Sequence, residues 1–335
     1  MSDPDALVSE IEALGGRLAE AKASIATRII GQEEVVDLAL SAMLSGGHAL
    51  LMGLPGLGKT LLVDTLSTVM GLSANRIQFT PDLMPADILG SEVLETAQDG
   101  SRSFRFLQGP IFCQLLMADE INRASPRTQS ALLQAMQERE VTIAGDHKPL
   151  PRPFHVLATQ NPIEQEGTYP LPEAQLDRFL VKIDVAYPDR DTERGILLAT
   201  TGTAEAKAHR VFTPEELIRA QGLVRQMPVG ETVVELILDL VRACRPDGEE
   251  APEIVRRTVA WGPGPRAAQA LMLTVRARAL LDGRLAPSVE DVAHLARPVL
   301  SHRMALTFGA RAEGAVLEQV IDEVTARITR VEAAA

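Results

Sequence analysis

The chain has 335 residues, of which 46% are hydrophobic and only 3% aromatic, and its formal net charge at pH 7 is −12. The acidic balance argues against a broad surface for duplex nucleic acid, and the scarcity of aromatic side chains argues against a stacking platform for single strands. Two cysteines and six dispersed histidines predict neither a disulfide framework nor a structural zinc site. No apolar run approaches ~18 residues. These features predict a cytoplasmic protein without membrane insertion, for which another protein is the favoured partner.

Strand and helix candidates alternate up to about residue 185, and only helix candidates follow. The first, residues 7–26, has the apolar spacing of an amphipathic helix, which Gly15 and Gly16 are expected to weaken or break. The strand candidates are residues 48–53, 76–79, 114–119, 154–159 and 179–184. The later helix candidates are residues 214–227, 232–245, 265–283, 288–304 and 315–330. This order predicts a parallel sheet with helices between its strands, followed by a helical region.

The octapeptide "GLPGLGKT", residues 53–60, has the spacing of a phosphate-binding loop. A strand candidate precedes it and a helix candidate follows it, as such a loop requires; a simple glycine turn is the alternative. Its glycines let backbone amides turn toward a phosphate at the positive end of a helix. Lys59 would then reach the β- and γ-phosphates, and the Thr60 hydroxyl would bind Mg²⁺. The predicted nucleotide contacts are Pro55, Gly56, Leu57, Gly58, Lys59, Thr60 and Leu61.

The stretch "QLLMADEINR" places two acids at the end of a strand candidate, Asp119 and then Glu120. Because consecutive side chains on a strand point in different directions, one carboxylate could hold the metal shell while the next polarises a water. An acidic strand end or helix cap is the alternative. The adjacent acid predicts hydrolysis, since a switch or a small-molecule kinase does not need a base at this position.

Three further polar residues follow. Asn161 ends the strand candidate in "FHVLATQNP", where its amide could hold the attacking water or touch the γ-phosphate. Arg178 ends a helix candidate before the last strand, where it could reach the nucleotide of a neighbouring subunit; a surface pair with Asp177 or Glu173 is the alternative. Arg266 begins a helix in "GPGPRAAQAL", where a bound γ-phosphate could draw the two halves together, or where it is an ordinary first-turn residue.

This order of motifs resembles the AAA+ ATPases, and within them the MoxR family, over nearly the whole chain. The resemblance is carried by "GLPGLGKT", "DEINRASPRTQSALLQAMQE", "ATQNP" and above all "EQEGTYPLPEAQLDRF". The segment "RIIGQEEVVDLAL", which contains Ile30, resembles the border of the adenine pocket. The resemblance implies an α/β fold, with an AAA+ P-loop three-layer parallel sheet domain followed by a smaller all-helical lid. The expected divisions are residues 1–190 for the core, with an N-terminal helix and two hairpin insertions, 191–212 for a linker and 213–335 for the lid.

The resemblance also implies roles for single residues. ATP and Mg²⁺ would be the cofactors, with Thr60 and Asp119 on the metal, Glu120 as the base that activates water and Asn161 as the sensor of the γ-phosphate. Arg178 would act as an arginine finger from the adjacent subunit, and Arg266 as a second sensor. A finger supplied in trans requires a homo-oligomeric ring, with a hexamer expected. Arg123, in "DEINR", is a further residue at the expected subunit edge, with a catalytic or a pairing role.

Two insertions have the pattern of β-hairpins. Residues 90–110 contain an Asp99-Gly100 turn signal, and residues 140–156 form a second candidate before the sensor strand. In the related AAA+ branch, such hairpins face the pore or the substrate; surface ribbons are the alternative. The first has mixed charges and the pair Phe104 and Phe106, which suit a polypeptide better than a phosphate backbone.

The favoured function is an ATP-hydrolysing, chaperone-like remodelling protein that matures other proteins. The resemblance implies partners with von Willebrand factor A domains, often for metal or cofactor insertion. The principal alternative is an AAA+ nucleic-acid motor or loader, which DNA or RNA would stimulate. A nucleotide switch that does not hydrolyse ATP is a third possibility, and steady-state turnover would separate it from the others.

Overall fold

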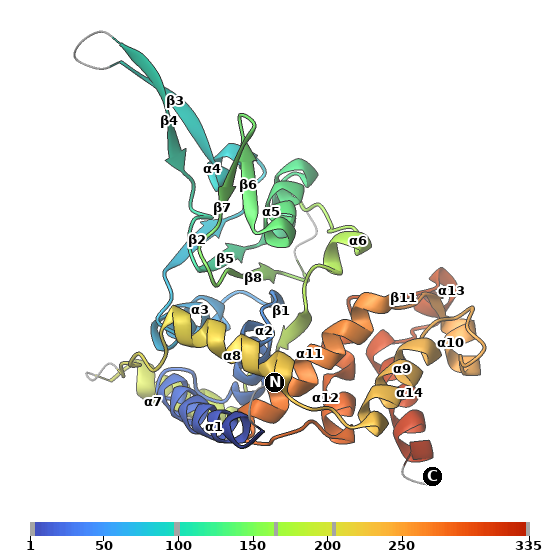
Figure 1. Ribbon diagram of the computed structural model, residues 1–335. Coiled ribbons are helices and arrows are strands. Elements are labelled where there is room, and N and C mark those ends of the chain that lie inside the picture. The colour runs from blue at the N-terminus through green and yellow to red at the C-terminus, as the bar shows by residue number, and fades with distance from the viewer. Residues whose placement is uncertain (1–3, 97–100, 164–166, 203–205, 333–335) are drawn as a thin grey trace.

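A five-stranded parallel sheet forms the centre of the protein in the computed structural model, which describes residues 4–96, 101–163, 167–202 and 206–332 (Figure 1). The strand order is β2-β5-β8-β1-β9. The strands are β1 (Ala49–Gly53), β2 (Ala74–Gln78), β5 (Leu115–Asp119), β8 (His155–Gln160) and β9 (Val181–Val185). Each overlaps one of the five predicted strands, and all neighbouring pairs are parallel. The predicted α/β class with a parallel sheet is therefore confirmed.

Side chains of successive strand residues enter two different hydrophobic layers. Leu51 and Met117 belong to one buried cluster, which also contains apolar residues of the N-terminal and C-terminal helices. Their sequence neighbours Leu50 and Leu116 belong to a second cluster on the other side of the sheet. This alternation produces three layers, because each face of the sheet is covered. Helix α2 (Glu33–Leu44) precedes β1. The helices between the strands are α3 (Lys59–Val69), α4 (Pro85–Leu89), α5 (Pro126–Glu138), α6 (Glu173–Leu176) and the 3₁₀ turn η1 (Ile121–Arg123).

The N-terminal helix α1 (Pro4–Ala26) runs without a break through both glycines, so the expected interruption at Gly15 and Gly16 was wrong. A Cβ atom at Gly15 would lie 3.4 Å from the Cα atom of Gly283, so this position allows two segments to approach closely. Leu18 on the same helix is fully buried. Burial of one helix face therefore outweighs the low helix propensity of two glycines.

The C-terminal half is helical apart from a short antiparallel ribbon, and it packs directly against α2 and β9. Its helices are α8 (Pro214–Gln226), α9 (Glu231–Ala243), α10 (Glu253–Thr258), α11 (Pro265–Leu281), α12 (Val289–Leu300), α13 (Phe308–Ala312) and α14 (Leu317–Glu332). The ribbon pairs β10 (Val259–Trp261) with β11 (Ala305–Leu306). Helix α7 (Arg190–Thr200) forms the first part of the segment, residues 191–212, that we propose connects the halves. Among the described residues, no helix is long and apolar enough to span a bilayer.

Both expected hairpins are present. In the first, β3 (Gly90–Thr96) pairs with β4 (Arg102–Gln108), and this ribbon projects away from the sheet (Figure 1). Its predicted Asp99-Gly100 turn lies outside the described residues. In the second, β6 (Glu140–Ile143) pairs with β7 (Asp146–Pro149) through a turn at Ala144 and Gly145, both with positive φ. The two ribbons meet where the Lys148 ammonium lies 5.7 Å from the centre of the Phe106 ring.

Candidate nucleotide site

The phosphate loop connects the end of β1 to the start of α3. Gly56 and Gly58 have φ angles of +84° and +76°, a left-handed conformation that favours glycine. Apart from its chain neighbours, no atom of the described residues lies within 4 Å of the place where a Cβ would stand on either residue, so their outer side faces open space. The Lys59 ammonium donates to the carbonyl oxygens of Gly53 and Leu54 within the loop. The backbone thus forms an open cradle of the kind that a triphosphate fits, and Thr60 follows in the first turn of α3.

A cavity of about 710 Å³ adjoins this cradle, and we call it the nucleotide cavity because loop residues form part of its wall. Ile30 lines it together with five of the predicted loop contacts, which are Pro55, Gly56, Leu57, Gly58 and Leu61. Its other walls come from residues that the sequence did not single out, including Tyr187, Pro188, Glu193 and Ile196. The latter two lie on α7, a helix with no buried residue. Only folding brings this helix over the loop, because no local signal connects it with the nucleotide.

The two acids lie at the end of β5, which is flanked by β2 and by β8, the strand that leads to Asn161. Strand β1, which leads to the loop, lies on the far side of β8. Asp119 is buried, whereas Glu120 follows it with φ +54°, a left-handed conformation that is unfavourable for a side chain other than glycine. Burial lowers the pKa of Lys59, and the negative charges of Asp119 and Glu120 oppose that shift. The acids therefore act electrostatically on the loop lysine, as expected for the two sides of one phosphate site.

A polar network, which the sequence interpretation missed, holds both acids. Arg76 on β2 pairs with one carboxylate oxygen of Asp119, and the Thr159 hydroxyl donates to the other. The Gln78 side-chain amide donates to Glu120 at 2.8 Å, and the Arg123 guanidinium pairs with Glu120 at 3.0 Å. The strand order supplies the reason, because β2 and β8 flank β5. Arg123 here acts as a pairing residue of its own subunit.

Asn161 follows the last residue of β8, at the same edge of the sheet as the acids and the loop. Its side-chain oxygen accepts a hydrogen bond from the backbone N–H of Ile163 at 3.2 Å. The strand order places Glu120, Asn161 and the phosphate loop at the carboxyl ends of three consecutive strands, where open α/β sheets bind ligands.

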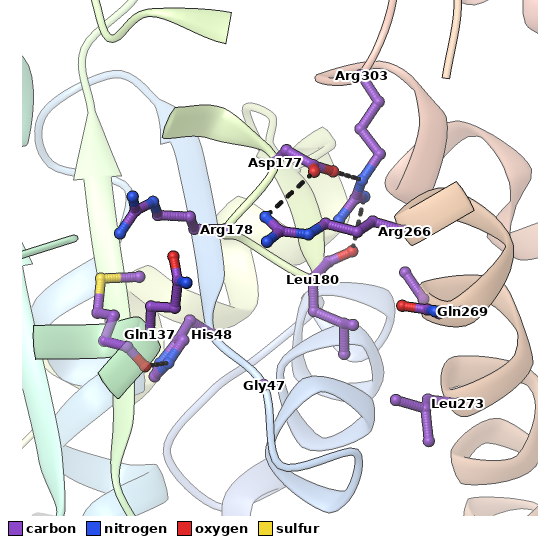
Figure 2. Close-up of a pocket in the computed structure, with 12 residues that line it drawn as sticks. Gly47, His48, Gln137, Asp177, Arg178, Leu180, Arg266, Gln269, Leu273 and Arg303 are labelled. Carbon is purple, nitrogen blue, oxygen red and sulfur yellow. Dashed lines mark hydrogen bonds and ion pairs between the residues drawn. The ribbon is translucent and has the colours of Figure 1, made fainter. Parts of the chain in front are cut away.

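The two predicted arginines lie together in a different place. Arg178 and Arg266 both line a cavity of about 250 Å³ between α5, the segment before β9, and α11 (Figure 2). The Arg178 guanidinium donates to the carbonyl oxygen of Leu133, and that of Arg266 lies 3.5 Å from the Asp177 carboxylate. Arg178 comes two residues after the end of α6, which is a single turn and shorter than expected. Among the described residues, this arginine cavity and the nucleotide cavity share no lining residue.

Known proteins resemble the chain over both halves. The profile described as "ATPase family associated with various cellular activities (AAA)" matches residues 48–181, and the AAA lid domain profile matches residues 251–324. Chaperone MoxR1 of Mycobacterium tuberculosis is 41% identical over 320 residues, covering 96% of this chain and 83% of that protein. Protein MoxR of Paracoccus denitrificans is 30% identical, with 89% and 91% covered. A crystal structure of a protein from Cytophaga hutchinsonii superposes with a TM-score of 0.87 at 36% identity, covering 94% of this chain and 96% of that one.

Proposed function

Because the chain belongs to the MoxR family of AAA+ ATPases, we propose that it hydrolyses ATP between neighbouring subunits of a ring and uses the energy to remodel other proteins. Two separate sets of polar residues support this proposal. One surrounds the phosphate loop, and the other surrounds the arginine cavity.

Within one subunit, the loop amides and Lys59 bind the phosphates, and the cavity beside Ile30 holds the adenosine. Thr60 and Asp119 would hold Mg²⁺, which would supply positive charge beside the phosphates. Glu120 accepts a proton from the attacking water, and Asn161 orients that water or the γ-phosphate. Gln78 and Arg123, which contact Glu120, keep its carboxylate near the sheet edge.

The separation of the arginine cavity from the nucleotide cavity is the observation that carries the ring proposal. A finger must contact the transferring phosphoryl group to stabilise its charge. Arg178 donates instead to Leu133 of α5, and Arg266 faces Asp177. We therefore place both arginines at the subunit edge, aimed at a neighbour's nucleotide. For Arg266 this differs from the sequence-based expectation, in which it met the nucleotide of its own subunit.

Mixed assemblies test this arrangement. Arg178→Ala alone should lose roughly 10³-fold or more in turnover, and Glu120→Gln alone roughly 10²-fold or more, while both still bind ATP. Mixing the two variants should restore part of the activity, because some interfaces then pair an intact base with an intact finger. Native mass spectrometry would verify that the subunits mix. Verified mixed rings without recovery would refute a finger supplied in trans.

The projecting hairpins support protein clients rather than nucleic acid. Leu94 and Phe104 are cross-strand partners on the first hairpin, and their side chains are 52% and 70% exposed. Arg105 pairs with Glu95 at 2.8 Å, so this arginine charge is neutralised and not presented to a phosphate backbone. A ribbon with an exposed apolar pair and a neutralised arginine suits an unfolded or loosely folded segment of polypeptide.

We propose a partner with a von Willebrand factor A domain from the family resemblance alone. An interaction screen with the Glu120→Gln variant, in which complexes with ATP should persist, would identify clients and partners. Stimulation of turnover by DNA or RNA, with none by captured proteins, would favour a nucleic-acid motor instead.

A further inference from the structure

Arg303, which follows α12 in the helical half, is an arginine that no motif indicated. Its side chain is 3% exposed, although it carries a charge. Its Nε atom donates to the Asp177 carboxylate at 2.7 Å, and Nη2 donates to the carbonyl oxygen of Phe179 at 2.7 Å. Its Nη1 atom donates to the carbonyl oxygens of Leu180 at 3.1 Å and of Val299. Three of these four acceptors belong to the short segment that contains Arg178.

We infer that Arg303 is a positioning residue that holds Arg178 in place for its role as the finger. This inference rests on the proposed function. Arg303 binds the residue before Arg178 and the two residues after it, so the backbone on both sides of the finger is attached to the helical half. Figure 2 shows the result, with Asp177 between Arg266 and Arg303 and the Arg178 side chain pointing away from them.

The chemistry of this contact requires an arginine. A planar guanidinium has N–H groups in a fixed arrangement, so it can donate hydrogen bonds to a carboxylate and several carbonyl oxygens at once. A lysine ammonium is instead a compact point charge. Burial lowers the pKa of Arg303, and the Asp177 carboxylate opposes that shift. His302 adds a neighbouring contact, because its Nε2–H donates to the carbonyl oxygen of Phe179 at 3.0 Å.

Helix α12, which Arg303 follows in the chain, also lies close to the nucleotide cavity. His294, on α12, lines a cavity of about 490 Å³ together with Gln32 and Tyr187, and these two also line the nucleotide cavity. The Nε2 atom of His294 lies 3.3 Å from the carboxylate of Glu34 on α2. A change in the position of α12 on nucleotide binding would therefore reach the finger segment through Arg303.

The first test asks whether loss of Arg303 has the same effect as loss of the finger. Arg303→Gln should bind ATP with unchanged affinity and lose roughly 10²-fold in turnover, as expected for a misplaced catalytic group. Mixing Arg303→Gln with Glu120→Gln should restore part of the activity, because some interfaces then pair an intact base with a correctly placed finger. Mixing it with Arg178→Ala should restore none, because neither variant then supplies a working finger. Arg242→Gln is the matched control, since Arg242 forms an ion pair with Glu250 inside the helical half, and it should behave as the unmodified chain.

The second test measures the segment itself and does not depend on catalysis. The backbone N–H groups of Phe179 and Leu180 donate to the carbonyl oxygens of Leu176 and His48. Arg303→Lys keeps a positive charge for Asp177 but loses the fork, so amide hydrogen exchange of residues 177–180 should be at least tenfold faster, with β1 unchanged. This variant should also show a smaller loss of turnover than Arg303→Gln, and it replaces that variant in the mixing test if Arg303→Gln does not fold.

The outcomes separate this inference from the proposal on which it rests. Recovery when Arg303→Gln meets Arg178→Ala in verified mixed rings would overturn the positioning role, as would unchanged exchange of residues 177–180 in Arg303→Lys. Absence of recovery between Glu120→Gln and Arg178→Ala would instead refute the trans finger, whatever the exchange of that segment.

Discussion

Lowering the pH should destabilise the sheet through two buried histidines beneath the nucleotide site. His48 and His155 lie at the starts of β1 and β8, the strands that lead to the phosphate loop and Asn161. His155 Nδ1–H donates to the carbonyl oxygen of Gly47 at 2.8 Å, and its Nε2 atom accepts from the Gln221 amide at 3.1 Å. His48 Nδ1 accepts from the backbone N–H of Val156 at 2.9 Å. Both rings are therefore neutral in the folded protein.

The magnitude follows from the two pKa values. Burial lowers the pKa of His48 to about 3 and that of His155 to about 4, and the positive charge of Arg139 adds to both shifts. The unfolded chain, with a histidine pKa near 6.5, binds protons that the folded protein does not. Stability is thus complete above about pH 6.5 and falls as the pH drops toward the folded values. At pH 5 each histidine should lower the free energy of unfolding by about 2 kcal/mol.

Urea denaturation at pH 7.5 and at pH 5 would measure this effect. His155→Gln retains a donor and an acceptor but cannot titrate, so its loss of stability between these pH values should be smaller by about 2 kcal/mol. His147→Gln is the control, since His147 is 66% exposed on the second hairpin. The range from pH 7.5 to pH 5 avoids the titration of Glu216. Its hydrogen bond with Arg17 lowers the pKa of Glu216 to about 2, so the stability that this carboxylate provides is lost only below about pH 4.5. An equal loss in His155→Gln and the unmodified chain would refute the reasoning.

Four other predictions concern single sites. Lys59→Ala should abolish ATP binding in calorimetry, and an unchanged affinity would contradict the phosphate-loop assignment. Thr60→Ala should increase the Mg²⁺ concentration needed for half-maximal turnover, whereas an identical requirement would remove Thr60 from the metal. Gly16→Ala should stabilise the protein by about 0.5–1 kcal/mol, because it lies within α1 with nothing within 4 Å of its Cβ position. Gly15→Leu should lower the thermal midpoint, because Gly283 leaves no room for a large side chain; equal midpoints for these two variants would contradict the packing of α1.

Local patterns in the sequence predicted the elements whose signals are short-range. Strands β1, β5 and β8 are short apolar-rich runs, and the phosphate loop is recognisable because glycine spacing, Lys59 and Thr60 lie within eight residues. The first hairpin was predicted with an Asp-Gly turn signal, and that turn lies outside the described residues. The expected break in α1 failed for the opposite reason, because the burial that keeps the helix continuous depends on residues more than 250 positions away.

The sequence by itself thus predicted the class of fold, a phosphate-binding loop and the family to which the chain belongs. Only the tertiary structure decided which residues surround each functional group. Arg76 and Gln78 meet the two acids because β2 lies beside β5, and α7 covers the nucleotide cavity. Arg303 reaches the finger segment across 123 to 126 positions of sequence. Such contacts produce no recognisable pattern in the local sequence. A buried guanidinium is stabilised by hydrogen-bond acceptors, and these acceptors come together only when the helical half packs against the sheet.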